Sequence, residues 1–90
     1  MKATFKKYKV DGNTYYLAQK GDIVALINSE SYHKPLEKYL NKRFCYYIYP
    51  KIDGWDVADY VYSYDYDVYE ILPTLRECKN SVQNFYFSKN

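Results

Sequence analysis

The chain has 90 residues, which is enough for one hydrophobic core, so we expect a single domain over residues 1–90 and no second one. Its 14 tyrosines and its net charge of only +2 are the opposite of a disordered composition. The longest apolar stretches, 23–27 and 44–49, are far shorter than the ~20 residues that span a bilayer, and no apolar signal core follows the first lysines. We therefore expect no membrane insertion, no export and a cytoplasmic location.

The first third of the chain predicts three antiparallel strands in consecutive order. Thr, Phe, Tyr and Val are frequent over 3–10, and a second β-prone run follows over 14–18. Asp11-Gly12-Asn13 between them supplies residues that tolerate positive φ, which predicts a hairpin. Another turn signal, Lys20-Gly21-Asp22, precedes 23–27, a continuous apolar run suited to a strand covered on both faces.

One principal amphipathic helix is predicted for about residues 33–43. Residues 29–31 offer capping hydroxyls, Pro35 suits a first helical turn, and apolar residues recur at helical spacing. We then expect a strand over 44–49, which Pro50 ends. Basic side chains lie along the predicted solvent face of the helix, at Lys34, Lys38, Lys42 and Arg43.

The pattern from 60 to 72 fits both a strand and a helix. Because tyrosine and valine favour a pleated surface, we predict a strand over roughly 62–71, with a short helical turn at 56–60 capped by Asp56. After Pro73, residues 74–79 can form one or two helical turns, and 81–87 is predicted as the last strand. The predicted fold class is α+β, a small domain built mainly from an antiparallel sheet of about five strands with one principal helix.

The chain has few residues suited to metal or cofactor binding. Cys45 and Cys78 are too few for a disulfide scaffold and are not spaced as a metal knuckle, so we expect reduced, buried thiols, although a bridge between them stays open. His33 is the only histidine, and the glycines at 12, 21 and 54 cannot build a P-loop or a dinucleotide fingerprint. We therefore predict no cofactor and no metal site.

Catalytic residues are not apparent either. A Cys-His dyad would need the fold to bring a thiol to His33. Asp65 and Asp67 could act as the paired carboxylates of a hydrolase. Two carboxylates at positions i and i+2 of a strand lie on one face, however, and this pattern is equally typical of a solvent-exposed sheet edge. We predict that the protein is not an enzyme.

Charge divides the chain into two parts of opposite sign. Residues 1–51 carry 10 Lys and Arg against 4 Asp and Glu, whereas 52–90 carry 3 against 7. Six carboxylates and no basic residue lie between 53 and 70, interleaved with tyrosines and the one tryptophan. Aromatic side chains anchor protein interfaces, and a field of one sign steers a complementary partner. We predict a partner-binding surface made of Trp55, Asp56, Asp59, Tyr60, Tyr62, Tyr64, Asp65, Tyr66, Asp67 and Glu70.

The complement of such a surface is a basic groove, as nucleic-acid-handling proteins present. We therefore hypothesise a non-enzymatic inhibitor that docks onto a host protein of this kind. A small chain rich in Tyr, Lys, Asn and Asp is common among bacteriophage and mobile-element proteins, so an anti-defence role like that of anti-CRISPR proteins, in the host-cell cytoplasm, is one form of the hypothesis. An immunity protein against a basic toxin is another. The competing interpretation of this segment is a half-buried strand whose tyrosines pack inward. A homodimer is a further alternative, because exposed sheet edges can pair with a second copy of the chain.

The basic part of the chain supports a different hypothesis, a small nucleic-acid-binding protein. Lysines would follow the phosphates while Tyr8, Tyr15 or Tyr16 stacks on bases. The pI of 8.4 is milder than the values above ~9 that usually mark such domains. The candidate nucleic-acid-binding residues are Lys6, Lys7, Lys9, Lys34, Lys38, Lys42 and Arg43.

Overall fold

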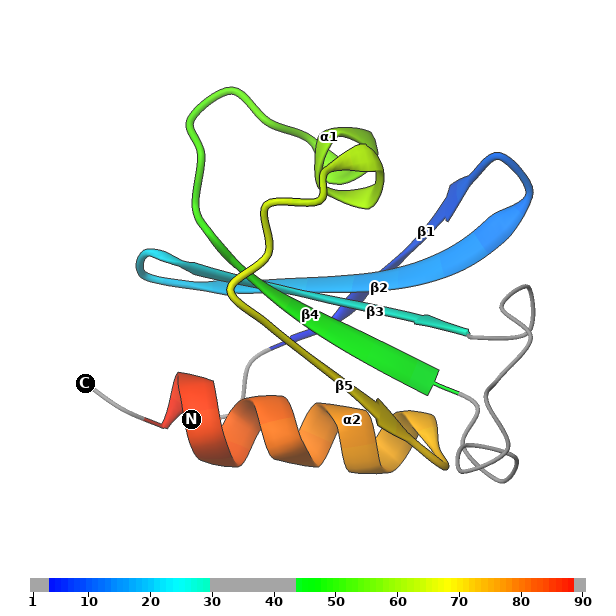
Figure 1. Ribbon diagram of the computed structural model, residues 1–90, viewed down its shortest axis with the longest axis vertical. Helices are drawn as coiled ribbons and strands as arrows, with labels where there is room; N and C mark the ends of the chain where they lie inside the picture. Colours follow the sequence, from blue (N-terminus) through cyan, green and yellow to red (C-terminus); the bar gives the residue numbers. More distant parts are fainter. Residues whose placement is uncertain (1–3, 30–43, 89–90) are drawn as a thin grey trace.

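A computed structural model describes residues 4–29 and 44–88, and within these ranges a five-stranded antiparallel sheet lies between two helical layers (Figure 1). Each strand pairs with the next one along the chain, in the order β1-β2-β3-β4-β5. The predicted α+β class and the sheet of about five strands are confirmed. The helix predicted at 33–43 lies outside the described residues. The strands are β1 (Lys6–Val10), β2 (Asn13–Lys20), β3 (Ile23–Ser29), β4 (Phe44–Pro50) and β5 (Val68–Leu72).

Both predicted tight turns are present, and each joins strands that pair directly. Val10 pairs with Asn13 across the first turn, where Asp11 and Gly12 have φ of 52° and 82°. Two successive positive φ angles match the right-handed twist of the flanking strands, and Asp-Gly is a favoured pair for them. In the second turn, Gly21 has a φ of 57°, which glycine adopts without steric cost.

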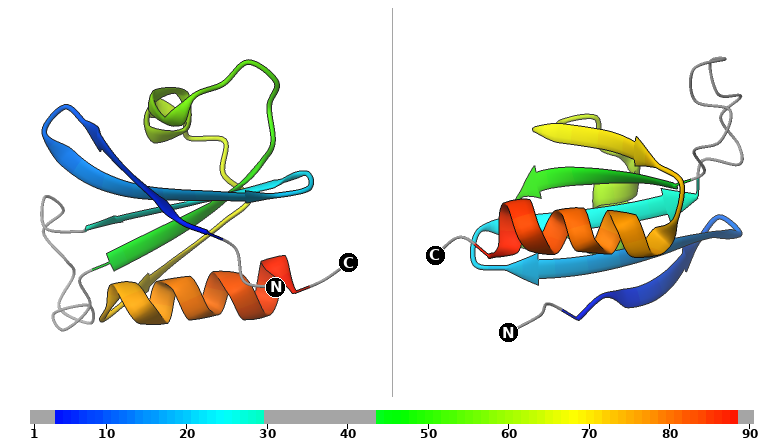
Figure 2. Two further views of the ribbon diagram at one scale, coloured as in Figure 1. Left: turned by 180° about the vertical axis from the view of Figure 1, so that it is seen from behind. Right: turned by 90° about the horizontal axis from the view of Figure 1, so that it is seen from below.

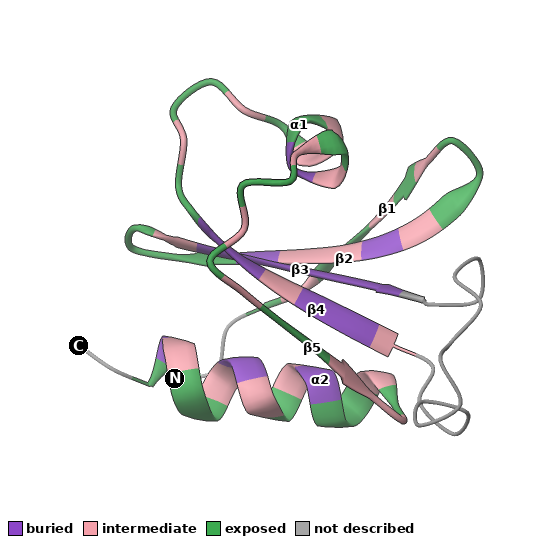
Figure 3. Ribbon diagram, viewed as in Figure 1, coloured by how far each residue is buried: buried purple, intermediate pink, exposed green. Residues whose placement is uncertain are grey.

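The central strand β3 is covered on both faces, as its apolar run predicted. Residues Val24 to Ile27 are all buried (Figure 3). Successive side chains of a strand point to opposite sides of the sheet. Ala25 and Ile27 pack with Val82 and Phe87 on the face that α2 covers, which we call the α2 face. The opposite side, the α1 face, has a second core, formed by Tyr15, Val24, Leu26, Tyr49 and Tyr60.

The short helix α1 (Val57–Tyr62) begins at a capping box. The Asp59 amide donates to the Asp56 carboxylate at 3.2 Å, and the Asp56 amide donates to the Asp59 carboxylate at 2.9 Å. The predicted helical turn capped by Asp56 is therefore confirmed. The strand predicted over 62–71 is wrong in its first part, because α1 continues through Tyr62 and β5 begins only at Val68.

The last segment is helical throughout. Thr74 caps α2 (Leu75–Val82) by accepting a hydrogen bond from the Glu77 amide at 3.1 Å, and a π-helical turn, η3 (Gln83–Phe87), continues it. Figure 2 shows the two as one rod across the strands, on the side of the sheet away from α1. The strand predicted over 81–87 is therefore wrong. Its apolar residues belong to a helical stripe that buries Cys78, Val82 and Phe87. Among the described residues, no helix has the length and apolar character needed to cross a membrane.

Candidate functional site

A groove of about 330 Å³ opens on the α1 face of the sheet. Its floor comes from β2, β3 and β4, and its wall comes from the end of α1 and the connection that leads to β5. Six of its described lining side chains are tyrosines, so we call it the tyrosine groove. It is lined by Asn13, Tyr15, Leu26, Asn28, Tyr47, Tyr49, Val61, Tyr62, Ser63, Tyr64 and Tyr66.

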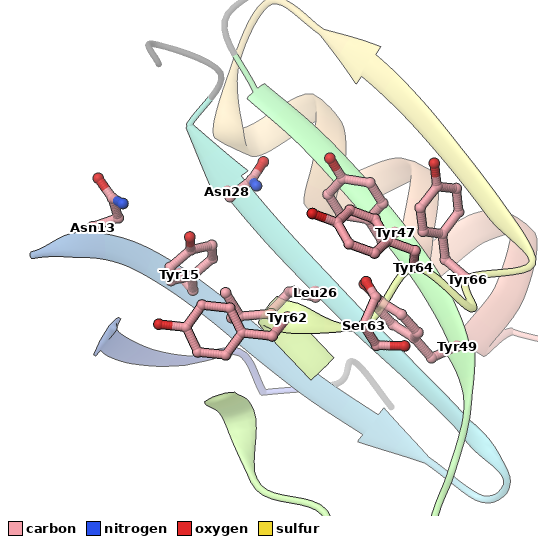
Figure 4. A pocket seen from close by; sticks show the side chains of 11 residues that line it. Asn13, Tyr15, Leu26, Asn28, Tyr47, Tyr49, Tyr62, Ser63, Tyr64 and Tyr66 are labelled. Atoms are coloured by element: carbon pink, nitrogen blue, oxygen red, sulfur yellow. The ribbon is translucent and has the colours of Figure 1, made fainter. Parts of the chain in front are cut away.

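Two tyrosines on the wall of the tyrosine groove are exposed, whereas most of the groove's floor is buried. Tyr62 is 58% exposed and Tyr64 is 89% exposed, while Tyr15 and Tyr49 are buried. Figure 4 shows the rings of Tyr15 and Tyr62 on one side of the hollow and those of Tyr47 and Tyr64 on the other. A large part of the aromatic surface around the groove therefore faces water.

Tyr66 holds the deeper aromatic side chains together. Its ring centroid lies 4.9 Å from that of Tyr47 and 6.2 Å from that of Tyr49. It also meets the half-exposed ring of Tyr69 edge-on at 5.5 Å. Such tilted and edge-to-face pairs add to the stability that burial provides. The aromatic cluster thus extends from the groove to β5, where Tyr69 pairs with Tyr47 across the strands.

The connection between α1 and β5 is anchored at both ends. The Ser63 amide donates to the Tyr60 carbonyl of α1 at 3.2 Å, and the Asp67 amide donates to the Ile48 carbonyl of β4 at 2.7 Å. Within the connection, the Asp65 amide donates to the Ser63 hydroxyl at 3.1 Å. The side chains of Asp65 and Asp67 are exposed. The described residues that line the groove carry no charged side chain, and Asp65 and Asp67 are their direct neighbours in the chain.

The predicted partner-binding residues divide into two groups. Tyr62, Tyr64, Asp65 and Asp67 are exposed, and Tyr66 is half-buried in the groove. The prediction is wrong where it placed Tyr60 on the surface, because this residue is only 3% exposed. Its ring packs against Trp55, which is itself half-buried.

Three of the predicted carboxylates have structural contacts. Asp56 and Asp59 form the capping box of α1. Glu70 accepts a hydrogen bond from the hydroxyl of Tyr46 at 2.7 Å. All three remain exposed. Glu70 lies opposite Tyr46 and therefore on the α2 face, so it does not share a surface with the tyrosine groove, which corrects the prediction for this residue.

Sequence reasoning missed the floor of the groove. Asn28 comes from the central strand, Tyr47 from β4 and Tyr15 from β2, and only the register brings them together: Tyr15 lies opposite Asn28. The alternation of Tyr47 and Tyr49 along a predicted strand was the available signal, because residues two apart share a face.

Two buried groups stay protonated at neutral pH. Burial raises the pKa of the Cys78 thiol to about 12, and the charges of Glu70 and Glu77 act in the same direction. Burial also raises the pKa of the Tyr46 phenol well above its usual range, and its hydrogen bond to the Glu70 carboxylate adds to this. Cys45 and Cys78 are both buried thiols, which confirms the prediction for them. Since the thiolate is the reactive form, Cys78 is not poised as a nucleophile.

The structure does not gather the described basic candidates on one face. Lys6 shares the α1 face with Leu17, whereas Lys7 and Lys9 point to the α2 face. The predicted stacking ring of Tyr15 is buried, which corrects that expectation. Lys79 lies over the ring of Tyr16, with its ammonium nitrogen 5.2 Å from the ring centroid. The remaining candidates, Lys34, Lys38, Lys42 and Arg43, lie outside the described residues together with His33.

Outside the tyrosine groove, the described structure has a further hollow. This second hollow, of about 520 Å³, borders the start of α1 beside Trp55 and Lys51. Across residues 4–29 and 44–88, no group of three or more His, Cys, Asp or Glu side chains could hold a metal ion. No protein-family model, curated protein or solved structure matches the chain. The groove has to be interpreted from its own residues.

Proposed function

We propose that the protein is a non-enzymatic protein-binding module that docks the tyrosine groove onto a basic surface of a partner protein. The observation that carries this proposal is the exposure of Tyr62 and Tyr64, 58% and 89%, on the wall of a groove. Covering such rings removes apolar surface from water and costs little side-chain entropy, which is why tyrosines concentrate at interfaces.

The charge of the partner follows from the acidic segment that contains the groove wall. Six carboxylates and no basic residue lie between positions 53 and 70, and Asp65 and Asp67 are exposed and adjoin the wall residues Tyr64 and Tyr66 in the chain. A surface of one sign accelerates association with an oppositely charged surface and disfavours partners of like charge. A basic protein surface is therefore the favoured target.

The proposed consequence of docking is inhibition. Proteins that handle nucleic acids hold phosphates with lysine and arginine side chains, so a module that covers those side chains competes with the nucleic acid. An anti-defence protein of a bacteriophage, acting in the manner of anti-CRISPR proteins, would work in this way. An immunity protein that neutralises a basic toxin would use the same contact.

The test compares three forms of the protein as baits in lysate of its native host cells, with and without nuclease treatment. Wild type and Phe85→Ala should retain the same protein, while the double variant Tyr62→Ala/Tyr64→Ala should lose it. Phe85 is the matched control because it is 62% exposed and lies on η3, on the other side of the sheet. Equal retention by the double variant, with unchanged thermal unfolding, would contradict the proposal. Capture that disappears on nuclease treatment would favour the nucleic-acid hypothesis.

A further inference from the structure

We infer that the tyrosine groove receives an arginine side chain of the partner, with its guanidinium group stacked on the exposed rings of the groove wall. This inference rests on the proposed function and names the group that the groove recognises. Three properties lead to it: accessible ring faces, described lining residues that are polar but uncharged, and exposed carboxylates next to these residues in the chain.

The exposed tyrosine rings provide a surface on which a guanidinium group can stack. Tyr62 and Tyr64 expose most of their surface, and Tyr47 and Tyr66 meet at an angle of 53° with their centroids 4.9 Å apart. Rings at several orientations around one hollow can present both faces and edges to a single bound group. The face of an aromatic ring attracts a cation within about 6 Å of its centroid, and guanidinium groups use this contact more often than ammonium groups do.

The lining decides between classes of ligand. The exposed phenol hydroxyls of Tyr62 and Tyr64 and the amide of Asn13 provide hydrogen-bond acceptors, and no lysine or arginine is among the described residues that line the groove. A carboxylate or phosphate would be repelled by the exposed carboxylates of Asp65 and Asp67, which adjoin the lining residues in the chain. A purely apolar side chain would take the exposed Tyr62 and Tyr64 hydroxyls out of water without offering them a hydrogen-bond partner, which is unfavourable.

Arginine fits better than lysine for two reasons. Its planar group can stack on a ring while its five N–H donors point to acceptors around the plane. An ammonium group is compact and strongly hydrated, so it loses more when it leaves water. Asp65 is exposed and adjoins Tyr64 and Tyr66 in the chain, so its negative charge lies within the distance over which charges attract a cation in water.

The probes for the test are three capped tripeptides, Gly-X-Gly, in which X is arginine, lysine or citrulline. Citrulline keeps the shape of arginine but is neutral. Titrations are followed by NMR of the tyrosine ring resonances at peptide concentrations up to about 10 mM, since one side chain binds weakly. We expect the arginine peptide to shift the rings of Tyr62, Tyr64 and Tyr66 and to bind roughly fivefold or more tightly than either other peptide.

Two variants localise the effect. Tyr64→Ala should weaken binding of the arginine peptide roughly fivefold, and Phe85→Ala should leave it unchanged. Tyr64 is the most exposed of these rings, so its removal should preserve the dispersion of the amide spectrum. Equal binding of the citrulline or lysine peptide, or no shift of these rings with the arginine peptide, overturns the inference. A dimer in sedimentation that dissociates on Tyr64→Ala also overturns it, because a second copy would then occupy the groove.

The two proposals fail in different ways. If the arginine peptide does not bind but Tyr62→Ala/Tyr64→Ala still loses the partner, the groove docks a partner through other chemistry and only the arginine inference fails. If the double variant keeps the partner in full, the proposed docking surface itself is wrong, whatever the peptides do.

Discussion

Cys78 makes the stability of the protein depend on pH. Its side chain is fully buried, and burial raises the pKa of its thiol to about 12, whereas a cysteine in an unfolded chain titrates near ~8.5. Between these values the unfolded state binds fewer protons than the folded state, so the free energy of unfolding falls as the pH rises. The contribution of Cys78 is complete below pH ~8.5 and decreases by about 1.4 kcal/mol for each pH unit above it.

We therefore predict that Cys78→Ala is less stable than wild type by roughly 1 kcal/mol at pH 7.5, because a small buried apolar group is lost. By pH 10 this difference should shrink by at least about 1 kcal/mol, since only the wild type carries the titrating thiol. Urea unfolding at both pH values measures it. Val82→Ala is the matched control: it lies in the same cluster but keeps Cys78, so its deficit should not change with pH for this reason. A Cys78→Ala deficit that is equal at pH 7.5 and pH 10 would contradict the linkage.

Among the elements, α1 depends most on its first residues. It has only six residues and one buried side chain, Tyr60, so the capping box supplies a large share of what keeps it folded. We predict that Asp56→Ala lowers the free energy of unfolding by about 1 kcal/mol and speeds amide exchange in α1. Asp56→Asn keeps the capping oxygen but removes the charge, so it should stay close to wild type in stability. Equal destabilisation by both would assign the effect to charge instead of capping.

The elements that the sequence predicts correctly are those whose signals are local. Asp11-Gly12 and Gly21 mark turns through the φ angles that they tolerate, and the apolar run at 23–27 marks a central strand. The two errors arose where β propensity and helical spacing competed. At Tyr62, the alternating tyrosines favoured a strand, although the capping box of Asp56 and Asp59 had already started a helix.

The second error and the incomplete site have related causes. Phe and Tyr residues over 81–87 favoured a strand, yet Leu75, Cys78 and Val82 form the beginning of a helical stripe that continues into this segment. For the site, the exposed wall was predictable because it is one stretch of chain, 62–66. The floor was not, because Tyr15, Asn28 and Tyr47 come from three strands and meet only through strand order and register.

At the scale of the whole molecule, the proposed docking surface depends on where charge lies and not on how much there is. Asp65 and Asp67 are exposed beside the tyrosine groove, whereas Asp22 and Glu77 are exposed at a hairpin turn and in the first turn of α2. Each change of one of these residues to lysine adds two positive charges. The double variants Asp65→Lys/Asp67→Lys and Asp22→Lys/Glu77→Lys therefore both have a net charge of +6 in place of +2.

This pair of variants separates local steering from net charge. We predict that Asp65→Lys/Asp67→Lys slows association with the captured partner roughly tenfold at low salt, because the partner then approaches a surface of its own sign. The effect should diminish near 0.5 M salt, where the Debye length falls to roughly 4 Å. Asp22→Lys/Glu77→Lys should associate at a rate much closer to that of wild type. Biolayer interferometry at two salt concentrations measures both rates. If the two variants slow association equally, net charge alone governs the approach, and the carboxylates beside the groove have no special part in docking.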